Sequence, residues 1–191
     1  MRKSIALALS MAAIGATMLT SAAMTGPVMA ATTTRVADTP GGGDPDTTMT
    51  FTVTVGALTM TAPTTVDLGA GGPGTTISGA LGPVAVTDAR ALLTATWTAT
   101  VSSSDFTTGG GTPAETIPAT DVAYDPGTIT TTGTITATGT PVTLSNAAQP
   151  TVTGSAGVGD NSASWNPALA VAVPSSAVGG AYTATLTQSV S

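Results

Sequence analysis

The sequence has no cysteine and no histidine, and only 7% of its 191 residues are charged. Without a thiol or an imidazole, the chain cannot build a Ser-His-Asp or Cys-His catalytic arrangement. It also lacks the usual ligands of a zinc site. Because no disulfide can form, hydrophobic packing must hold the fold together.

The N-terminus has the pattern of an export signal. Arg2 and Lys3 form a short positive region, an apolar stretch follows from Ile5 to Leu19, and Val28-Met29-Ala30 provides small residues before a cut. We therefore expect residues 1–30 to be a signal peptide cleaved after Ala30, and the mature protein to be secreted. The alternative, an uncleaved membrane anchor, is disfavoured because the apolar run is short for a membrane span.

The mature chain is also poor in positive charge. After cleavage, only Arg35 and Arg90 remain basic against ten acidic residues, and no lysine is left for a Ser-Lys pair. Two cations cannot neutralise a phosphate backbone or hold the chain on anionic lipids. We therefore expect no nucleic-acid partner, and no membrane partner after signal cleavage.

Carboxylates are the only catalytic groups left. Paired carboxylates can hydrolyse glycosides, but Glu115 is the only glutamate and most aspartates occupy turns. The sequence therefore predicts that the protein is not an enzyme and has no cofactor. Calcium is the one open alternative, because four aspartates could converge at one end of a sandwich and supply hard oxygen ligands: Asp88, Asp105, Asp121 and Asp125.

Threonine alternating with apolar residues is the dominant pattern. In the stretch 93–102, LTATWTATVS, five residues are expected to face a core, and these are Leu93, Ala95, Trp97, Ala99 and Val101. Strict alternation of this kind is typical of a strand with one buried and one solvated face. The same pattern predicts strands over 49–55, 58–62, 129–137 and 182–190.

Taken in order, the chain predicts a signal peptide (1–30), a flexible leader (31–48) and one domain (49–191). About nine strands, separated by turn signals every eight to fifteen residues, predict an all-β fold, a single antiparallel β-sandwich of Ig-like or WxL-like type. Polar connections are expected at 87–90, 103–113 and 146–163. The only plausible turn of helix is 88–93.

Four aromatic residues are candidate ligand contacts: Trp97, Phe106, Trp165 and Tyr182. Each has a plainer interpretation as a core residue, because large aromatic side chains are usually buried. Alternation favours the core interpretation for Trp97. Functional contacts are then expected mainly in the connections 103–113 and 146–163.

The region from about Ser78 onwards resembles the WxL family of Gram-positive surface proteins. The resemblance lies in SGALGPVAVTDAR, TATWTATVSSSDFT, IPATDVAYDPG, WNPALAVAVP and GGAYTATLTQSVS. Ala99 stands where the first family motif usually has leucine, and Gln188 stands where a second tryptophan is usual. The resemblance implies an exported WxL domain at the cell surface, attached non-covalently to peptidoglycan and often in complexes with other surface proteins.

Two functions follow as hypotheses. The first is a non-catalytic peptidoglycan-binding module of the cell wall. The alternative is a structural or adhesive subunit that assembles with itself or with other surface proteins. The threonine-rich outer faces of the strands, with few charges to block edge pairing, suit either packing against a partner or O-glycosylation.

Overall fold

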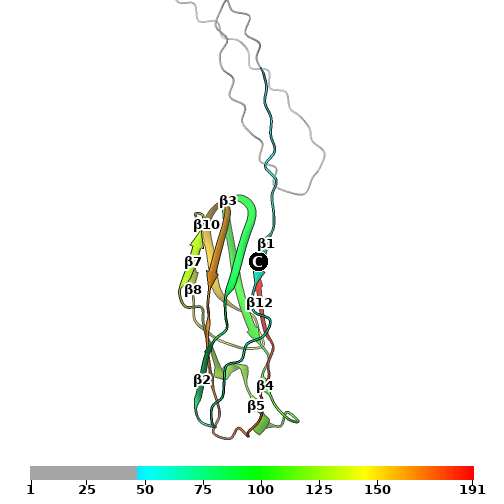
Figure 1. Ribbon diagram of the computed structural model, residues 1–191, viewed down its shortest axis with the longest axis vertical. Helices are drawn as coiled ribbons and strands as arrows, with labels where there is room; N and C mark the ends of the chain where they lie inside the picture. The colour runs from blue at the N-terminus through cyan, green and yellow to red at the C-terminus, as the bar shows by residue number, and fades with distance from the viewer. Residues whose placement is uncertain (1–46) are drawn as a thin grey trace, which may run out of the picture.

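The computed structural model describes residues 47–191, so the predicted signal peptide and most of the predicted leader lie outside the described residues. Antiparallel strands make up almost all of the regular structure there (Figure 1). The strands are β1 (Leu58–Thr61), β2 (Thr76–Ala80), β3 (Val84–Ser103), β4 (Phe106–Thr107), β5 (Thr116–Ile117), β6 (Val122–Asp125), β7 (Ile129–Thr132), β8 (Thr136–Gly139), β9 (Val142–Thr143), β10 (Gln149–Trp165), β11 (Ala168–Ala172) and β12 (Leu186–Val190), with 3₁₀ turns η1 (Pro113–Glu115) and η2 (Ala119–Asp121). The predicted all-β antiparallel sandwich is confirmed. The described residues form twelve strands, several of them short, where about nine were expected. In residues 47–191, no helix is long and apolar enough to cross a membrane.

Two long strands, β3 and β10, form the centre of the fold and pair along most of their length. Both contain residues with positive φ, Ala91 in β3 and Ala156 and Gly159 in β10, where the pairing is irregular. Figure 1 shows the paired strands turning over at the upper end of the molecule. The two halves of this ribbon therefore form two facing layers. One layer adds β1 and β7, and the other adds β12 and β8.

Shorter strands build the opposite end of the molecule. β2, β11, β6 and β9 form a four-stranded sheet, and this sheet continues the first layer because β2 leads into β3 and β11 follows β10. β4 and β5 form a two-stranded sheet, and a bridge joins Thr107 of β4 to Thr183. Two connections, 62–75 and 173–185, complete this end.

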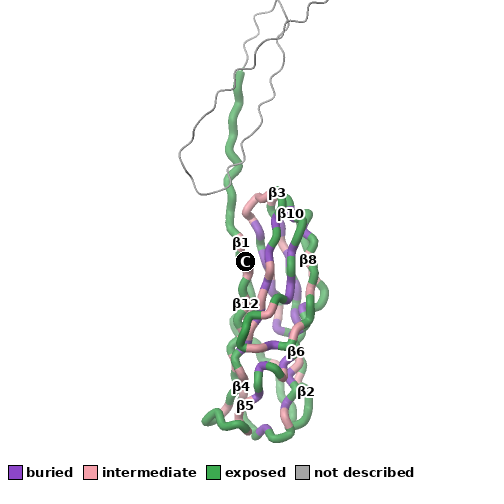
Figure 2. The backbone as a smooth tube through the Cα atoms, turned by 180° about the vertical axis from the view of Figure 1, so that it is seen from behind, coloured by how far each residue is buried: buried purple, intermediate pink, exposed green. Residues whose placement is uncertain are grey.

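One hydrophobic cluster fills the space between the layers (Figure 2). Trp97 is its largest residue in β3, 3% exposed, and the register places it opposite Gly154 of β10. The indole lies so close to Gly154 that a Cβ at this position would collide with the ring. A glycine is therefore required at this position to make room for the tryptophan.

The predicted inward parity holds for Ala95, Trp97, Ala99 and Val101, which are all buried. The prediction is wrong for Leu93, which is 67% exposed. Leu93 lies close to the bend at Ala91, where positive φ interrupts the regular alternation of side chains.

The predicted polar connection at 87–90 and helical turn at 88–93 are also wrong, because both stretches lie inside β3. Asp88 is 1% exposed. Arg90 donates two hydrogen bonds to its carboxylate, from Nε to Oδ1 at 2.8 Å and from Nη2 to Oδ2 at 2.7 Å. Nη2 also donates to the carbonyl of Thr96 at 2.8 Å, beyond the bend. The ion pair therefore ties the two arms of the bent strand together.

Two further predictions are corrected by the pairing. The connection expected at 146–163 is mostly strand β10, whose Gly, Ser and Ala residues give no hydrophobic alternation to recognise. The single strand expected at 129–137 is divided at Gly133, with φ of 81°, into β7 and β8, which pair with different parts of β10. Glycine adopts this left-handed conformation readily.

Asn161 of β10 holds the connection between β7 and β8 in place. Its side-chain oxygen accepts the backbone N–H of Thr134 at 2.9 Å and of Ile135 at 3.1 Å, and its amide nitrogen donates to the carbonyl of Gly159 at 2.9 Å. Replacing Asn161 with alanine leaves the buried N–H of Ile135 without a partner. We expect a loss of about 1–3 kcal/mol in the free energy of unfolding, measured by urea denaturation. Asn146→Ala, at an exposed connection, is the control and is expected to change stability by less than about 0.5 kcal/mol.

The strand predicted at 49–55 is not formed within this chain. Residues 47–55 are exposed and extended, and they pair with no other described strand. Val53 and Val55 lie beside the bend at Ala91, and backbone hydrogen bonding to the fold begins at Gly56, whose N–H donates to the carbonyl of Ala89 at 2.7 Å. Figure 1 shows the segment leaving the sandwich at the end where β3 and β10 turn over.

Candidate functional site

An apolar groove of about 740 Å³ opens in the half of the sandwich away from the bend. Its floor consists of core side chains from both layers, and these include Ile117, Val122, Leu144, Leu169 and Val171. The connection 62–71 lies along one side and residues 177–188 along the other. Asp67 is the only charged residue in the lining, so the groove is suited to apolar side chains.

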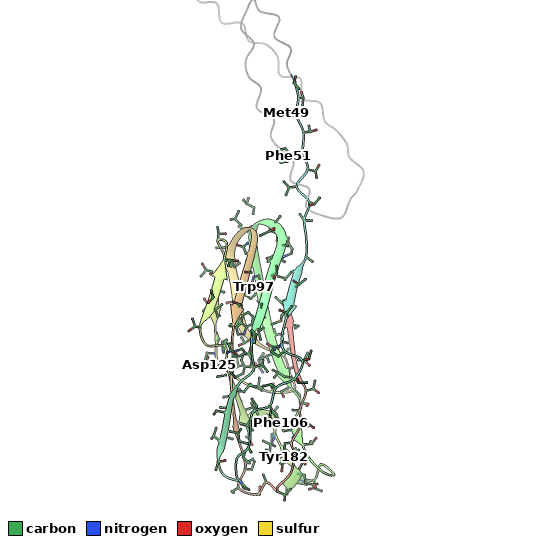
Figure 3. The ribbon with its side chains drawn as sticks, in the orientation of Figure 1. Met49, Phe51, Trp97, Phe106, Asp125 and Tyr182 are labelled. Carbon is green, nitrogen blue, oxygen red and sulfur yellow. The ribbon has the colours of Figure 1, made fainter. Side chains whose placement is uncertain are left out.

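Phe106 and Tyr182 both line this groove, although they are 76 positions apart in the sequence. Figure 3 shows both at the lower end of the molecule. Phe106 pairs with Ile117 through β4 and β5. The Tyr182 hydroxyl lies 3.1 Å from the carbonyl of Ala114 and 3.0 Å from that of Val178, which are its acceptors. The tyrosine ring is therefore held at the groove wall by its own hydroxyl.

The two tryptophans lie elsewhere. Trp97 and Trp165 are each 3% exposed and belong to the core, so neither indole offers a face to a surface ligand. Trp165 Nε1 donates to the Tyr124 hydroxyl at 3.1 Å, and this hydroxyl donates to Gln188 Oε1 at 3.3 Å. Burial raises the pKa of Tyr124, which keeps its hydroxyl protonated. This chain of hydrogen bonds connects the core to Gln188 at the groove.

The groove is bordered by an open sheet edge. The main chain at 183, 185 and 191 bonds to Thr107, Ser104 and Thr98 on one side. Hydrogen bonding alternates along an antiparallel strand, so the N–H and C=O groups of the even-numbered residues 184, 186 and 188 point to the other side. Within residues 47–191, β12 pairs with β3 alone. These same even-numbered residues are half-buried at the groove, whereas Thr183 and Thr185, which also line it, are exposed.

The acidic candidates have local structural roles. Glu115 Oε2 accepts both the backbone N–H of Thr112 at 3.0 Å and its hydroxyl at 2.8 Å. The backbone N–H bond is the main reason why the pKa of Glu115 lies below its usual value. Asp105 accepts the N–H of Ala119, and Asp125 accepts that of Gly127. Across residues 47–191, no three His, Cys, Asp or Glu side chains form a group able to hold a metal ion, so the four aspartates considered for calcium are not gathered together.

Sequence reasoning found two groove residues, Phe106 and Tyr182, and missed the groove itself. The alternation at 182–190 was a usable signal, because it placed Tyr182, Ala184, Leu186 and Gln188 on one face. The open edge depends on which strands pair with β12, and periodicity carries no such information.

Comparisons with protein-family models, with curated proteins and with solved structures each found no match to this chain.

Proposed function

We propose that the protein is an exported, non-catalytic structural subunit that joins other cell-surface chains by taking an extended peptide segment into its groove. The observation that carries the proposal is the edge at residues 184–188, which no strand of residues 47–191 pairs with, directly beside an apolar groove. Such an edge binds a peptide as an added strand, with main-chain hydrogen bonds for affinity and pockets for alternate side chains for specificity.

The lining of the groove favours a peptide over a polar ligand. Asp67 is the only charged lining residue, and its carboxylate already accepts the N–H of Gly69 at 2.9 Å. The polar tips of Tyr182 and Gln188 are also engaged within the chain. A segment with apolar side chains on one face would therefore fill the groove without leaving a buried polar group unpaired.

The location at the cell surface rests on two features of the sequence. Residues 1–30 have the pattern of a secretory signal peptide. The resemblance to the WxL family implies a Gram-positive cell surface, where peptidoglycan and other surface proteins are the available partners.

A strand-binding assay tests this function. The mature protein is titrated into a fluorescent peptide of alternating valine and threonine, and anisotropy is measured. We expect saturable binding that Ala184→Asp weakens about tenfold or more, because it places a charge in the apolar groove. Thr187→Asp, on the exposed face of β12, is the matched control and is expected to bind like the original chain. Absence of saturable binding would reject the proposal.

Peptidoglycan binding is the second candidate function, favoured by the placement of Phe106 and Tyr182 on the same groove. Aromatic faces at one site offer a surface on which apolar parts of a ligand can stack. Sedimentation of the mature protein with isolated peptidoglycan tests it. Protein in the pellet at low and high salt supports wall binding, and protein that stays in the supernatant rejects it.

A further inference from the structure

We infer that the strand that fills the groove is residues 49–55 of a second copy of this chain. The inference rests on the proposed function, because it names the partner that the groove receives. In this segment Met49, Phe51, Val53 and Val55 alternate with threonines, which is typical of a half-buried strand. Within residues 47–191 the segment pairs with no strand. Met49 and Phe51 are 82% and 74% exposed, and Val53 and Val55, beside the bend, are 56% and 41% exposed.

The segment matches the open edge in length and pattern. Residues 49–55 and 182–188 are each seven residues long, about 23 Å as extended strands. On the acceptor, Tyr182, Ala184, Leu186 and Gln188 are half-buried at the groove, and the threonines between them are exposed, Thr183 and Thr185 at the groove and Thr187 outside it. A donor strand added beside them places its four apolar side chains over the groove and its threonines in solvent. Both strands then have an apolar face towards the groove and a threonine face towards solvent.

The segment cannot fill the groove of its own chain. It is anchored at Gly56 and leaves the sandwich at the bend, whereas Phe106 and Tyr182 lie at the opposite end (Figure 3). Nine extended residues, 49–57, span about 30 Å, which is about the length of β3 between Ala91 and Val101. A segment that turned back would be used up before it could lie along residues 182–188. The donor must therefore come from another molecule.

This contact is head-to-tail, because the donor segment and the groove are different surfaces at opposite ends of one chain. A dimer joined in this way still offers one free segment on one copy and one free groove on the other. Heterologous contacts that do not close into a ring produce open filaments. The assembly expected from this geometry is therefore a linear chain of sandwiches.

Cysteine cross-linking tests the contact, since the chain has no cysteine of its own. Thr50→Cys, Thr52→Cys and Thr54→Cys on the donor are each mixed with Thr185→Cys on the acceptor, all at exposed positions. We expect a disulfide-linked dimer in at least one mixture, and a ladder of covalent oligomers when one chain has both substitutions. Thr128→Cys, at an exposed position before β7, replaces Thr185→Cys as the control. Cross-linking no greater than with this control would overturn the inference.

Charge placed on either face of the donor gives an independent test. Phe51→Asp/Val53→Asp puts two charges on the groove-facing side, and Thr52→Asp/Thr54→Asp puts the same charges on the solvent side. We expect neither pair to disturb the fold, because all four substituted positions are exposed and lie outside the strands. By sedimentation velocity of the mature chain, we expect the first pair to weaken self-association about tenfold or more and the second to leave it nearly unchanged. If the two double variants self-associate equally strongly, the inference is overturned.

The two proposals fail in different ways. Binding of the valine-threonine peptide without self-association would overturn the inference and keep the proposed function. Self-association that Phe51→Asp/Val53→Asp does not weaken, but Ala184→Asp does, would also overturn only the inference. If the mature protein neither binds the peptide nor self-associates, both the proposed function and the inference are rejected.

Discussion

Replacing Trp97 with alanine is expected to lower the free energy of unfolding by about 3–5 kcal/mol. The indole is 3% exposed and lies against Gly154, between the two layers that the bent ribbon brings together. Its removal leaves a cavity between strands that are paired along their length, so the surrounding backbone can collapse only in part. Urea denaturation followed by circular dichroism measures the change, because far-UV dichroism of the strands does not depend on the missing indole.

Leu93→Ala is the control for this substitution. Leu93 has the same sequence parity as Trp97 but is exposed at the bend, so its replacement is expected to cost less than about 0.5 kcal/mol. A loss below about 1 kcal/mol for Trp97→Ala, or equal losses for both variants, would contradict the placement of Trp97 in the core.

Arg90→Ala is expected to destabilise the fold by about 3–5 kcal/mol, because it leaves the buried carboxylate of Asp88 without its charged partner. The same variant removes the hydrogen bond to Thr96 that crosses the bend. Asp88→Asn/Arg90→Ala, which neutralises the buried group at nearly constant size, is expected to recover part of the loss. If this double variant were no more stable than Arg90→Ala alone, the unpaired charge would not be the cause.

The ion pair also gives stability a pH dependence. Hydrogen bonding from the Arg90 side chain holds the pKa of Asp88 below its usual value. A carboxyl whose pKa is lower in the folded chain stabilises the fold at pH above the unfolded value of about 3.9. That stability is lost as pH falls through the folded pKa. The difference in unfolding free energy between the original chain and Arg90→Ala is therefore largest near neutral pH and shrinks below about pH 4.

Alternation predicted the fold class because it reports directly which faces are buried. It placed Trp97 and Val101 in the core and put Tyr182 and Leu186 on one face. It failed where the ribbon bends, at Leu93, and where small residues carry no hydrophobic signal, in β10. The burial of Asp88 was also not predicted, because a buried carboxylate is recognised only once its partner Arg90 is in place.

The groove could not be predicted for a different reason. It exists because, within residues 47–191, β12 pairs on one side only and leaves its other edge open beside core side chains. The sequence predicts residues 49–55 as a strand, and this prediction requires a partner strand. The single chain supplies none among its described residues. In the proposed assembly, the partner is the β12 edge of the next copy, so the segment becomes a strand between molecules.

Amide hydrogen exchange as a function of protein concentration tests the central claim most directly. The mature chain is measured at a dilution where it is monomeric and at the highest soluble concentration. We predict that alternate amides of residues 49–55 and those of Ala184, Leu186 and Gln188 become protected together as concentration rises, because they bond to each other across the contact. Amides of β3 are protected at both concentrations. Association that leaves the 49–55 and 184–188 amides exchanging as fast as in the monomer would contradict the account.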